Sequence, residues 1–441
     1  MSKKSSGRTG GTWRPVRRSR IYPMVTRAQK KRWAAASDNA SYLHAAYLAH
    51  RDRLLPKYFG KFGEYPVPQG IGARLRWYIL DVGWGSWRQL RQNGSIVRRQ
   101  TGLSYPRQLW QMVSLAIRQP TNPKSYYRNE MYRPEVRERA NEFLYRYELK
   151  GVLYRLTIPK GADISTISPL TDKHEFAAKA RENDLPVAST LAVISEGKVV
   201  EAADEMPPIN LFVKPKNAQG GKGAQLWRYV EESDSYFREK NQKTVARSKF
   251  LDHLCGKAKR SIIVQPALSV HHDMTDLALS ALPTTRLITF TNEDGEPEIV
   301  AAALRMPRHQ NAIVDNSHAG GIAAAINLEE GTLGQWTSFA FDETSGHDTH
   351  PVTGATITGR KVPDWHDIVN LTHRAHRAFA PRALVGWDIC ITDQGPILVE
   401  GNAQPGDDPI QRLSGEPFGN SRFGQLLAHH IKLQLGQSQP S

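Results

Sequence analysis

Gly386–Asn402 reads GWDICITDQGPILVEGN, in which two short apolar runs flank the turn sequence Asp393-Gln394-Gly395. Asp and Gly are typical of tight turns, and Gly395 can take the positive φ that such turns require. The segment therefore predicts a β-hairpin. If Thr392 pairs with Pro396, the register of the whole hairpin follows from the turn.

That register places Asp388 directly opposite Glu400, and it puts Asn402 on the same face, because residues two apart point the same way. Two carboxylates that face each other repel, so the pair favours a bound cation. Carboxylate and amide oxygens suit Mg²⁺. The sequence thus predicts a magnesium site, although an edge hairpin with one solvated polar face is the alternative. The opposite face is apolar and comprises Trp387, Ile389, Ile391, Ile397 and Val399.

A glycine-rich loop lies upstream in LFVKPKNAQGGKGAQLWRY, residues 211–229. Closely spaced glycines let backbone N–H groups approach anionic oxygens, and Lys214 adds positive charge. No Ser or Thr follows a Gly-Lys pair at the Walker A spacing, so a P-loop is excluded. The segment indicates a phosphate-binding hairpin loop, with a plain surface turn as the alternative. Its central residues are Gly220, Gly221, Lys222 and Gly223.

Composition limits the class of protein. The chain has 441 residues, 39% of them hydrophobic, and two cysteines without a CxxC pattern. No apolar run reaches the roughly 18 residues of a membrane helix, and no apolar block follows the basic N-terminus as in a secretory signal. The scarcity of cysteine excludes a disulfide framework. These features predict a cytoplasmic globular protein.

The net charge of +16 is concentrated near the N-terminus, where residues 1–37 hold eleven Lys or Arg and no acidic residue. We expect residues 1–37 to form a disordered tail. Residues 38–165 read as a mostly helical region, with helices expected at 107–117 and 134–149. Trp77–Trp87 forms an aromatic patch between arginines, for which packing against the next lobe is favoured over contact with a membrane surface.

After residue 158 the pattern changes to short apolar runs between Gly, Asp and Asn turns, which predicts strands. The fold class expected is α+β, with two α+β lobes at 166–264 and 265–435. The expected strands are 190–195, 209–213, 261–264, 285–290, 299–304, 387–392 and 396–400.

Taken together, these motifs resemble the ATP-grasp superfamily, and most closely its sugar-transfer-associated branch, which is related to alpha-L-glutamate ligases. The resemblance extends over about residues 103–427, through "GLSYPRQLWQM", "LFVKPKNAQGGKG", "IIVQPALSVHHDM", "IVDNSHAGGIAAAINLEEGTLG", "THPVTGATITGRKVPDW" and "GWDICITDQGPILVEGN". It implies an ATP-grasp fold, in which two lobes hold ATP between them.

The resemblance also implies roles for individual residues. Lys214 would contact the α- and β-phosphates of ATP, the loop 220–223 would cover the triphosphate, and Asp388, Glu400 and Asn402 would hold Mg²⁺. Lys173 matches the second ATP-contacting lysine, and Lys179 competes for that role. The segment that would meet the adenine edge holds Gln265, Pro266, Ala267 and Leu268, with Gln265 where the superfamily usually has a ribose-binding glutamate.

Two arginines on predicted strands, Arg286 and Arg305, fit the stabilisation of a transferring phosphoryl group. A salt bridge to a carboxylate of the same lobe is the alternative for each. A polar loop that could line the acceptor pocket contains Asp315, Asn316, His318, Gly320 and Gly321. The pairs His347/His350 and His373/His376 lack further metal ligands, so zinc is not expected.

The activity implied is that of an ATP- and Mg²⁺-dependent carboxylate–amine ligase, which forms an acyl phosphate that an amine or another nucleophile attacks. A role in cell-surface polysaccharide modification is implied by analogy. The expected partners are a small or sugar-linked carboxylate and an amine, with no nucleic acid. Alternatives are a phosphotransferase acting on a hydroxyl, or a nucleic-acid- or membrane-binding protein that acts through the basic tail. Asp388→Asn is expected to abolish turnover without loss of the fold.

Overall fold

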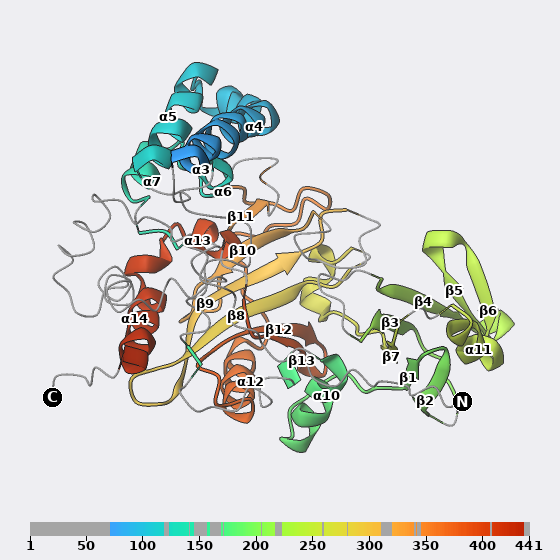
Figure 1. Ribbon diagram of the computed structural model, residues 1–441. Helices are drawn as coiled ribbons and strands as arrows, with labels where there is room; N and C mark the ends of the chain where they lie inside the picture. The colour runs from blue at the N-terminus through green and yellow to red at the C-terminus, as the bar shows by residue number, and fades with distance from the viewer. Residues whose placement is uncertain are drawn as a thin grey trace, which may run out of the picture.

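The computed structural model describes residues 71–118, 123–140, 142–144, 157–158, 169–170, 172–203, 205–216, 223–257, 260–279, 281–309, 320–338, 341, 345–405 and 408–435. Two antiparallel sheets and their helices form two lobes, and a bundle of helices lies over the larger lobe (Figure 1). The tail 1–37 lies outside the described residues, as do the predicted site residues Gly220, Gly221, Lys222, Asp315, Asn316 and His318. The predicted α+β class, with helices ahead of the sheets, is confirmed.

The smaller lobe is a seven-stranded sheet in the order β2-β1-β7-β3-β4-β5-β6. Its strands are β1 (Ala192–Ser195), β2 (Lys198–Ala202), β3 (Leu211–Pro215), β4 (Gln225–Val230), β5 (Ser235–Arg238), β6 (Lys243–Ala246) and β7 (Ile262–Pro266). The helix α11 (Phe250–Cys255) packs Phe250 against Trp227 and Tyr236 of the sheet. The predicted glycine-rich loop connects β3 to β4, so it belongs to a hairpin of this lobe.

The larger lobe is a six-stranded sheet in the order β11-β10-β9-β8-β12-β13. Its strands are β8 (Thr284–Thr291), β9 (Pro297–Met306), β10 (Ile322–Ile326), β11 (Leu333–Ser338), β12 (Leu384–Thr392) and β13 (Gly395–Asn402). All neighbouring strands are antiparallel. The strand β12 lies between β8 and β13 and is buried along its whole length, and this position inside the sheet explains its dense apolar sequence.

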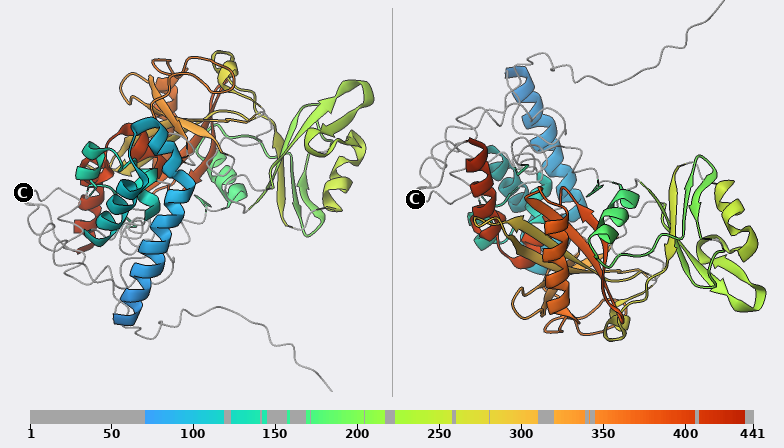
Figure 2. Two further views of the ribbon diagram at one scale, coloured as in Figure 1. Left: turned by 90° about the horizontal axis from the view of Figure 1, so that it is seen from above. Right: turned by 90° about the horizontal axis from the view of Figure 1, so that it is seen from below.

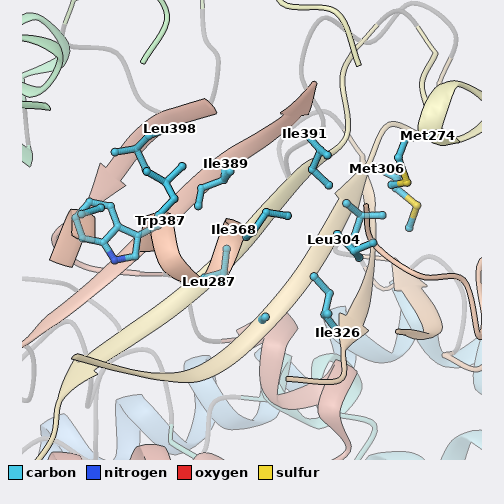
Figure 3. Packing of buried hydrophobic residues seen from close by; sticks show 14 of the residues in the cluster. Met274, Leu287, Leu304, Met306, Ile326, Ile368, Trp387, Ile389, Ile391 and Leu398 are labelled. Carbon is cyan, nitrogen blue, oxygen red and sulfur yellow. The ribbon is translucent and has the colours of Figure 1, made fainter. Parts of the chain in front are cut away.

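One face of the large sheet packs against the helix α12 (Trp365–Ala378), as the amphipathic pattern of that segment predicts. Figure 3 shows the apolar side chains of the strands, among them Trp387, Ile389 and Leu398, gathered with Ile368 of α12. The helices α13 (Asp408–Ser414) and α14 (Arg422–Leu435) cover the other face, where Phe423 contacts Phe290. Since alternate residues of a strand point to opposite faces, Asp388 lies on the face away from α12.

The hairpin β12–β13 closes one residue earlier than the sequence predicted. Thr392 pairs with Gly395 rather than with Pro396, and a bulge between Asp388 and Ile389 restores the predicted pairing of Asp388 with Glu400. The bulge also changes which β13 side chains are buried. Leu398 lies in the core, whereas the predicted Ile397 and Val399 are half-buried.

The helix α10 (Lys173–Glu182) precedes the small lobe in sequence but packs with the large one. Phe176 stacks on Phe379 with ring centroids 5.0 Å apart, and it belongs to the core cluster of the large sheet. The backbone N–H of Leu398 donates to the carbonyl of Pro186, so the segment after α10 adds to the edge of β13. α10 is thereby fixed beside the hairpin that carries Glu400.

The helical region consists of α3 (Ile71–Arg76), a π-helical segment Trp77–Trp84, α4 (Gly85–Thr101), α5 (Tyr105–Arg118), α6 (Pro123–Arg128) and α7 (Pro134–Glu138). The first three form one continuous helix, coloured blue in Figure 2. The helix predicted at 107–117 is confirmed by α5. The helix predicted at 134–149 is wrong, because it ends at Glu138, and the buried Phe143 and Leu144 follow in irregular backbone.

This region docks on the large lobe through aromatic packing of Phe341 on Tyr127 and Tyr132, and through polar contacts. The carboxylate of Glu130 accepts hydrogen bonds from the Ser345 backbone and hydroxyl, both at 2.8 Å, and Arg139 pairs with Glu416 at 2.7 Å. The predicted packing of the Trp77–Trp87 patch against the next lobe is wrong for Trp84 and Trp87, which are exposed. Among the residues that the structure describes, no helix has the length and apolar character needed to cross a bilayer.

Candidate functional site

The buried carboxylate of Asp388 is paired with two arginines. Arg286 Nε lies 2.5 Å from Asp388 Oδ1, and its Nη2 donates to Oδ2 at 3.1 Å. Arg305 Nη2 lies 3.0 Å from the same Oδ2. Asp388 is 4% exposed, so its charge depends on these partners rather than on water. Each predicted arginine therefore forms a salt bridge, and the carboxylate concerned is the predicted metal ligand.

Strand register sets this geometry. Arg286 on β8 is the cross-strand partner of Asp388 on β12, and Arg305 on β9 is the partner of Thr284 on β8. The Thr284 hydroxyl accepts from Arg305 Nη2 at 2.7 Å, which orients the guanidinium. At Gly386 a Cβ atom would lie 2.7 Å from Pro405 and 3.2 Å from Arg286 Nη1. The absence of a side chain at Gly386 thus gives Arg286 its space.

Glu400 is held more loosely than Asp388. Its side chain is 34% exposed, Lys173 Nζ lies 3.9 Å from Oε2, and Asn402 donates to Oε1 at 3.2 Å. Burial by itself would raise the pKa of Glu400, but Lys173, Arg286 and Arg305 outweigh it and hold the pKa below its usual value. Glu400 is therefore ionised at neutral pH.

Lys214 reaches the same group of charges from strand β3 of the small lobe. Burial lowers the pKa of Lys214 to about 8, Glu400 opposes that shift, and Lys173 adds to it. An amine with this pKa is protonated at neutral pH but has lost much of the hydration that normally stabilises its charge. An anion brought next to it would restore the missing stabilisation.

Sequence reasoning did not single out Asp172 and Lys216. Asp172 caps α10 by accepting from the backbone N–H groups of His174 and Glu175, at 2.9 and 3.2 Å, and it pairs with Lys216 at 3.3 Å. This contact joins α10 to the end of β3, and it fixes Lys173 beside Lys214. An Asp directly before a helix is a recognisable N-cap signal, so the sequence did carry the first half of this arrangement.

Lys173 and Lys179, the two candidates for the second ATP-contacting lysine, have different surroundings. Lys173 contacts Glu400, whereas the Lys179 ammonium lies over the ring of Phe379, 5.4 Å from its centroid. Of the predicted adenine-edge residues, Gln265 donates to the carbonyl of Ala188 at 3.1 Å, and the backbone N–H of Ala267 donates to Asn210. Pro266 has no N–H. The polar groups of this segment are thus partly engaged within the protein.

The predicted acceptor loop is described only from Gly320. Gly320 has φ +75°, and Gly321 is buried ahead of β10. The imidazole of His309 lies 3.0 Å from the position of a Cβ on Gly320. Glycine at 320 thus allows both the backbone conformation and the close approach of His309.

The assembled side chains can bind a metal together with a polyanion. Asp388, Glu400 and Asn402 offer hard oxygen ligands on one face of two adjacent strands, and this donor set fits Mg²⁺. Four cationic groups surround them, namely Lys173, Lys214, Arg286 and Arg305. Cations outnumber carboxylates, so the centre favours a ligand that carries several negative charges.

Comparison with known proteins identifies the family to which the chain belongs. A family model described as sugar-transfer associated ATP-grasp matches residues 158–417, more than half of the chain. No curated protein matches the sequence.

The chain also has distant matches among solved structures. An L-amino acid ligase from Bacillus licheniformis is 11% identical with a TM-score of 0.36, over 63% of this chain and 52% of that one. D-alanyl-alanine synthetase A from Vibrio cholerae O1 biovar eltor str. N16961 is 12% identical with a TM-score of 0.37, over 62% and 67%. A D-alanine–D-alanine ligase from Bacillus anthracis complexed with ATP is 9% identical with a TM-score of 0.35, over 63% and 71%. The chain spans about half the length of the first of these.

The ion pairs change the expectation for Asp388→Asn. Removal of this carboxylate takes from Arg286 and Arg305, which are 14% and 12% exposed, the ion-pair partner that they share. We expect the free energy of unfolding to fall by about 3 kcal/mol or more. Glu400→Gln is the matched control, and because its partner is distant and its side chain is partly solvated, we expect a loss below about 1 kcal/mol. Urea denaturation measures both, and equal losses would contradict the assignment.

Proposed function

Because the chain belongs to the sugar-transfer associated ATP-grasp family, we propose that it is an ATP- and Mg²⁺-dependent ligase that activates a carboxylate and transfers its acyl group to an amine or a related nucleophile. ATP and Mg²⁺ are the cofactors that go with this family. The supporting observation is the convergence of Lys173 and Lys214 with the Arg286–Asp388–Arg305 group around Glu400. In the balanced reaction a carboxylate, an amine and ATP give an amide, ADP and inorganic phosphate.

The residues divide the work by charge. In our proposal Lys214 and Lys173 bind the oxygens of the triphosphate, and the loop 220–223 covers it. Asp388, Glu400 and Asn402 hold Mg²⁺, which when bound neutralises phosphate charge and orients the transferring group. Glu400 is the carboxylate better placed to accept the ion, since its contacts are longer and its side chain is more exposed than that of Asp388.

The arginines would stabilise charge that develops during transfer. A donor that is already oriented needs no reorganisation when the charge moves, which makes such donors effective in catalysis. Arg305 meets this condition through Thr284, and Arg286 through its pairing with Asp388. We propose that these two guanidinium groups hold the negative charge that builds on the γ-phosphoryl oxygens.

Two finer proposals concern the substrate. The family description associates these proteins with sugar transfer, which supports a sugar-linked carboxylate and a role in polysaccharide modification. The main rival is a phosphotransferase that uses the same residues and phosphorylates a hydroxyl group. In the rival reaction the phosphoryl group stays on the product and no inorganic phosphate is released.

Hydroxylamine separates these reactions, because it captures acyl phosphates as stable hydroxamates. We expect the protein with ATP, Mg²⁺, hydroxylamine and a panel of sugar acids and amino acids to release ADP, inorganic phosphate and hydroxamate in equal amounts. Glu400→Gln is expected to release at least about a hundredfold less, as the loss of a group that holds the metal implies. A phosphorylated hydroxyl product without hydroxamate would establish the rival.

Nucleotide binding can be tested without a substrate. A non-hydrolysable ATP analogue at a hundred times its dissociation constant should stabilise the folded protein by about 2.7 kcal/mol. We expect this stabilisation in wild type only when Mg²⁺ is present, and we expect it to be lost in Glu400→Gln. Thermal unfolding with and without Mg²⁺ measures it. No response of the wild type under either condition would contradict the nucleotide site.

The low pKa of Lys214 predicts how nucleotide affinity depends on pH. The protonated amine binds phosphate, and the bound anion raises the pKa of Lys214 from about 8, so binding is coupled to proton uptake. Affinity should be constant well below pH 8, and it should fall up to about tenfold per pH unit above it. The Lys214→Met variant should bind the nucleotide weakly, and its affinity should not depend on pH between about 7.5 and 9.5. An unchanged profile in calorimetric titrations would exclude Lys214 as the group that titrates.

A further inference from the structure

An exposed surface of apolar and basic side chains covers the helical region. Of fifteen large apolar side chains exposed among the described residues, nine lie between residues 75 and 117. The most exposed of these nine are Trp110 at 64%, Leu75 at 60% and Trp84 at 58%. Apolar patches of this kind on a protein surface mark sites of interaction. We refer to the exposed side chains of residues 75–117 as the aromatic–arginine surface.

The surface follows one stripe of the continuous helix. Leu80, Trp84, Trp87, Arg91 and Arg98 are separated by four, three, four and seven residues, so they lie on one side of the helix. The rings of Trp84 and Trp87 stack at 4.7 Å, and the Arg91 guanidinium lies 4.9 Å from the centre of the Trp87 ring. The side chains that α4 buries are a different set, namely Ser86, Gln89 and Val97.

Charge separates this surface from an ordinary exposed core face. Residues 71–118 contain eight arginines and one acidic residue, Asp81. Among those whose side chains the structure describes, six arginines are exposed, at positions 76, 88, 91, 98, 99 and 107. The apolar stripe is therefore flanked by positive charge along its length.

We propose that the aromatic–arginine surface binds an anionic lipid bilayer, with the helix 71–101 lying in the plane of the headgroups. Trp, Leu and Ile at this spacing, with arginines beside them, are typical of helices that lie at a membrane interface. Tryptophan favours the headgroup level, and arginine is attracted to anionic lipids. The helix binds along its side and does not cross the bilayer, since its apolar residues occupy one stripe only.

Two other occupants fit less well. Nucleic acid would use the arginines and the Trp rings, but it gains nothing from exposed aliphatic groups such as Leu75, Ile79 and Leu80. A second copy of the chain would bring an equal set of arginines against this one, and like charges in contact oppose association. A lipid surface is complementary to both components.

This proposal is independent of the proposed enzymatic function. Figure 1 shows α3, α4 and α5 over the large lobe and far from strands β1 to β6, and in Figure 2 one end of the blue helix projects from the body. Substitutions on the stripe should therefore leave nucleotide binding at Lys214 and Glu400 unchanged. A membrane contact would place the proposed ligase next to lipid-linked substrates.

The test is sedimentation of the full-length protein with two kinds of vesicle. One contains phosphatidylcholine alone, and the other contains phosphatidylcholine with about 30% of the anionic lipid phosphatidylglycerol. We expect binding to the anionic vesicles only. Trp84→Gln/Trp87→Gln should lower the partition coefficient by roughly tenfold or more, because it removes interfacial apolar area and keeps the charge. Arg91→Gln/Arg98→Gln should lower it by about fivefold for each arginine.

Val199→Gln/Val200→Gln is the matched control, since these exposed apolar residues lie on β2 of the small lobe. It should bind as wild type does. Equal binding by the tryptophan variant would overturn the proposal and assign any vesicle binding to another part of the chain, such as residues 1–37. Absence of vesicle binding would also overturn it. So would a dimer or an RNA complex that the wild type and the control variant form and the tryptophan variant does not.

A second measurement needs no substitution. Brominated lipids quench tryptophans that enter the bilayer, so anionic vesicles containing them should reduce the fluorescence of the wild-type protein, whereas brominated neutral vesicles should not. Unchanged fluorescence at a lipid concentration that sediments the protein would exclude insertion of Trp84 and Trp87. This outcome would also overturn the proposal.

Discussion

The pairing of Asp388 with Arg286 and Arg305 is the contact on which the site depends. A carboxylate that is 4% exposed is costly to keep ionised unless hydrogen-bonded cations surround it. The two arginines come from β8 and β9, so the strand order β9-β8-β12 is required by charge as well as by the apolar core. The other face of β12 contributes Trp387 and Ile389 to the packing against α12. One strand thus joins the core to the site, and a shift of its register by one residue would disrupt both.

Much of the hairpin could be predicted from sequence, because its contacts are local. Asp388 and Glu400 are separated by a short turn, and strand alternation across that turn predicts that they lie opposite each other. The predicted turn was one residue too long, and the bulge after Asp388 compensated for the error. No sequence rule identified the bulge. For that reason the burial of Leu398 in place of Ile397 and Val399 was missed.

Contacts distant in sequence were beyond such reasoning. Arg286 and Asp388 are 102 residues apart, and their pairing requires knowledge that β8 lies beside β12. The choice between Lys173 and Lys179 has a similar cause. Six residues along a helix place the two lysines on different sides, and only the packing of α10 on Phe379 reveals which side faces the hairpin. The small-lobe strands β5 and β6 were also missed, since each is only four residues long.

The two carboxylates of the site differ in a way that bears on mechanism. Asp388 is neutralised by two guanidinium groups within about 3 Å, whereas Glu400 has one lysine at 3.9 Å and an amide. An ion that binds between them must compete with the two arginines for Asp388, but with the more distant Lys173 and the Asn402 amide for Glu400. The cost of displacing the arginines is reduced if the incoming ligand also carries anionic oxygens, because each guanidinium can then exchange a carboxylate for a phosphate. Metal and polyanion are therefore expected to bind this centre together more readily than either binds alone, since each supplies the counter-charge that the other needs.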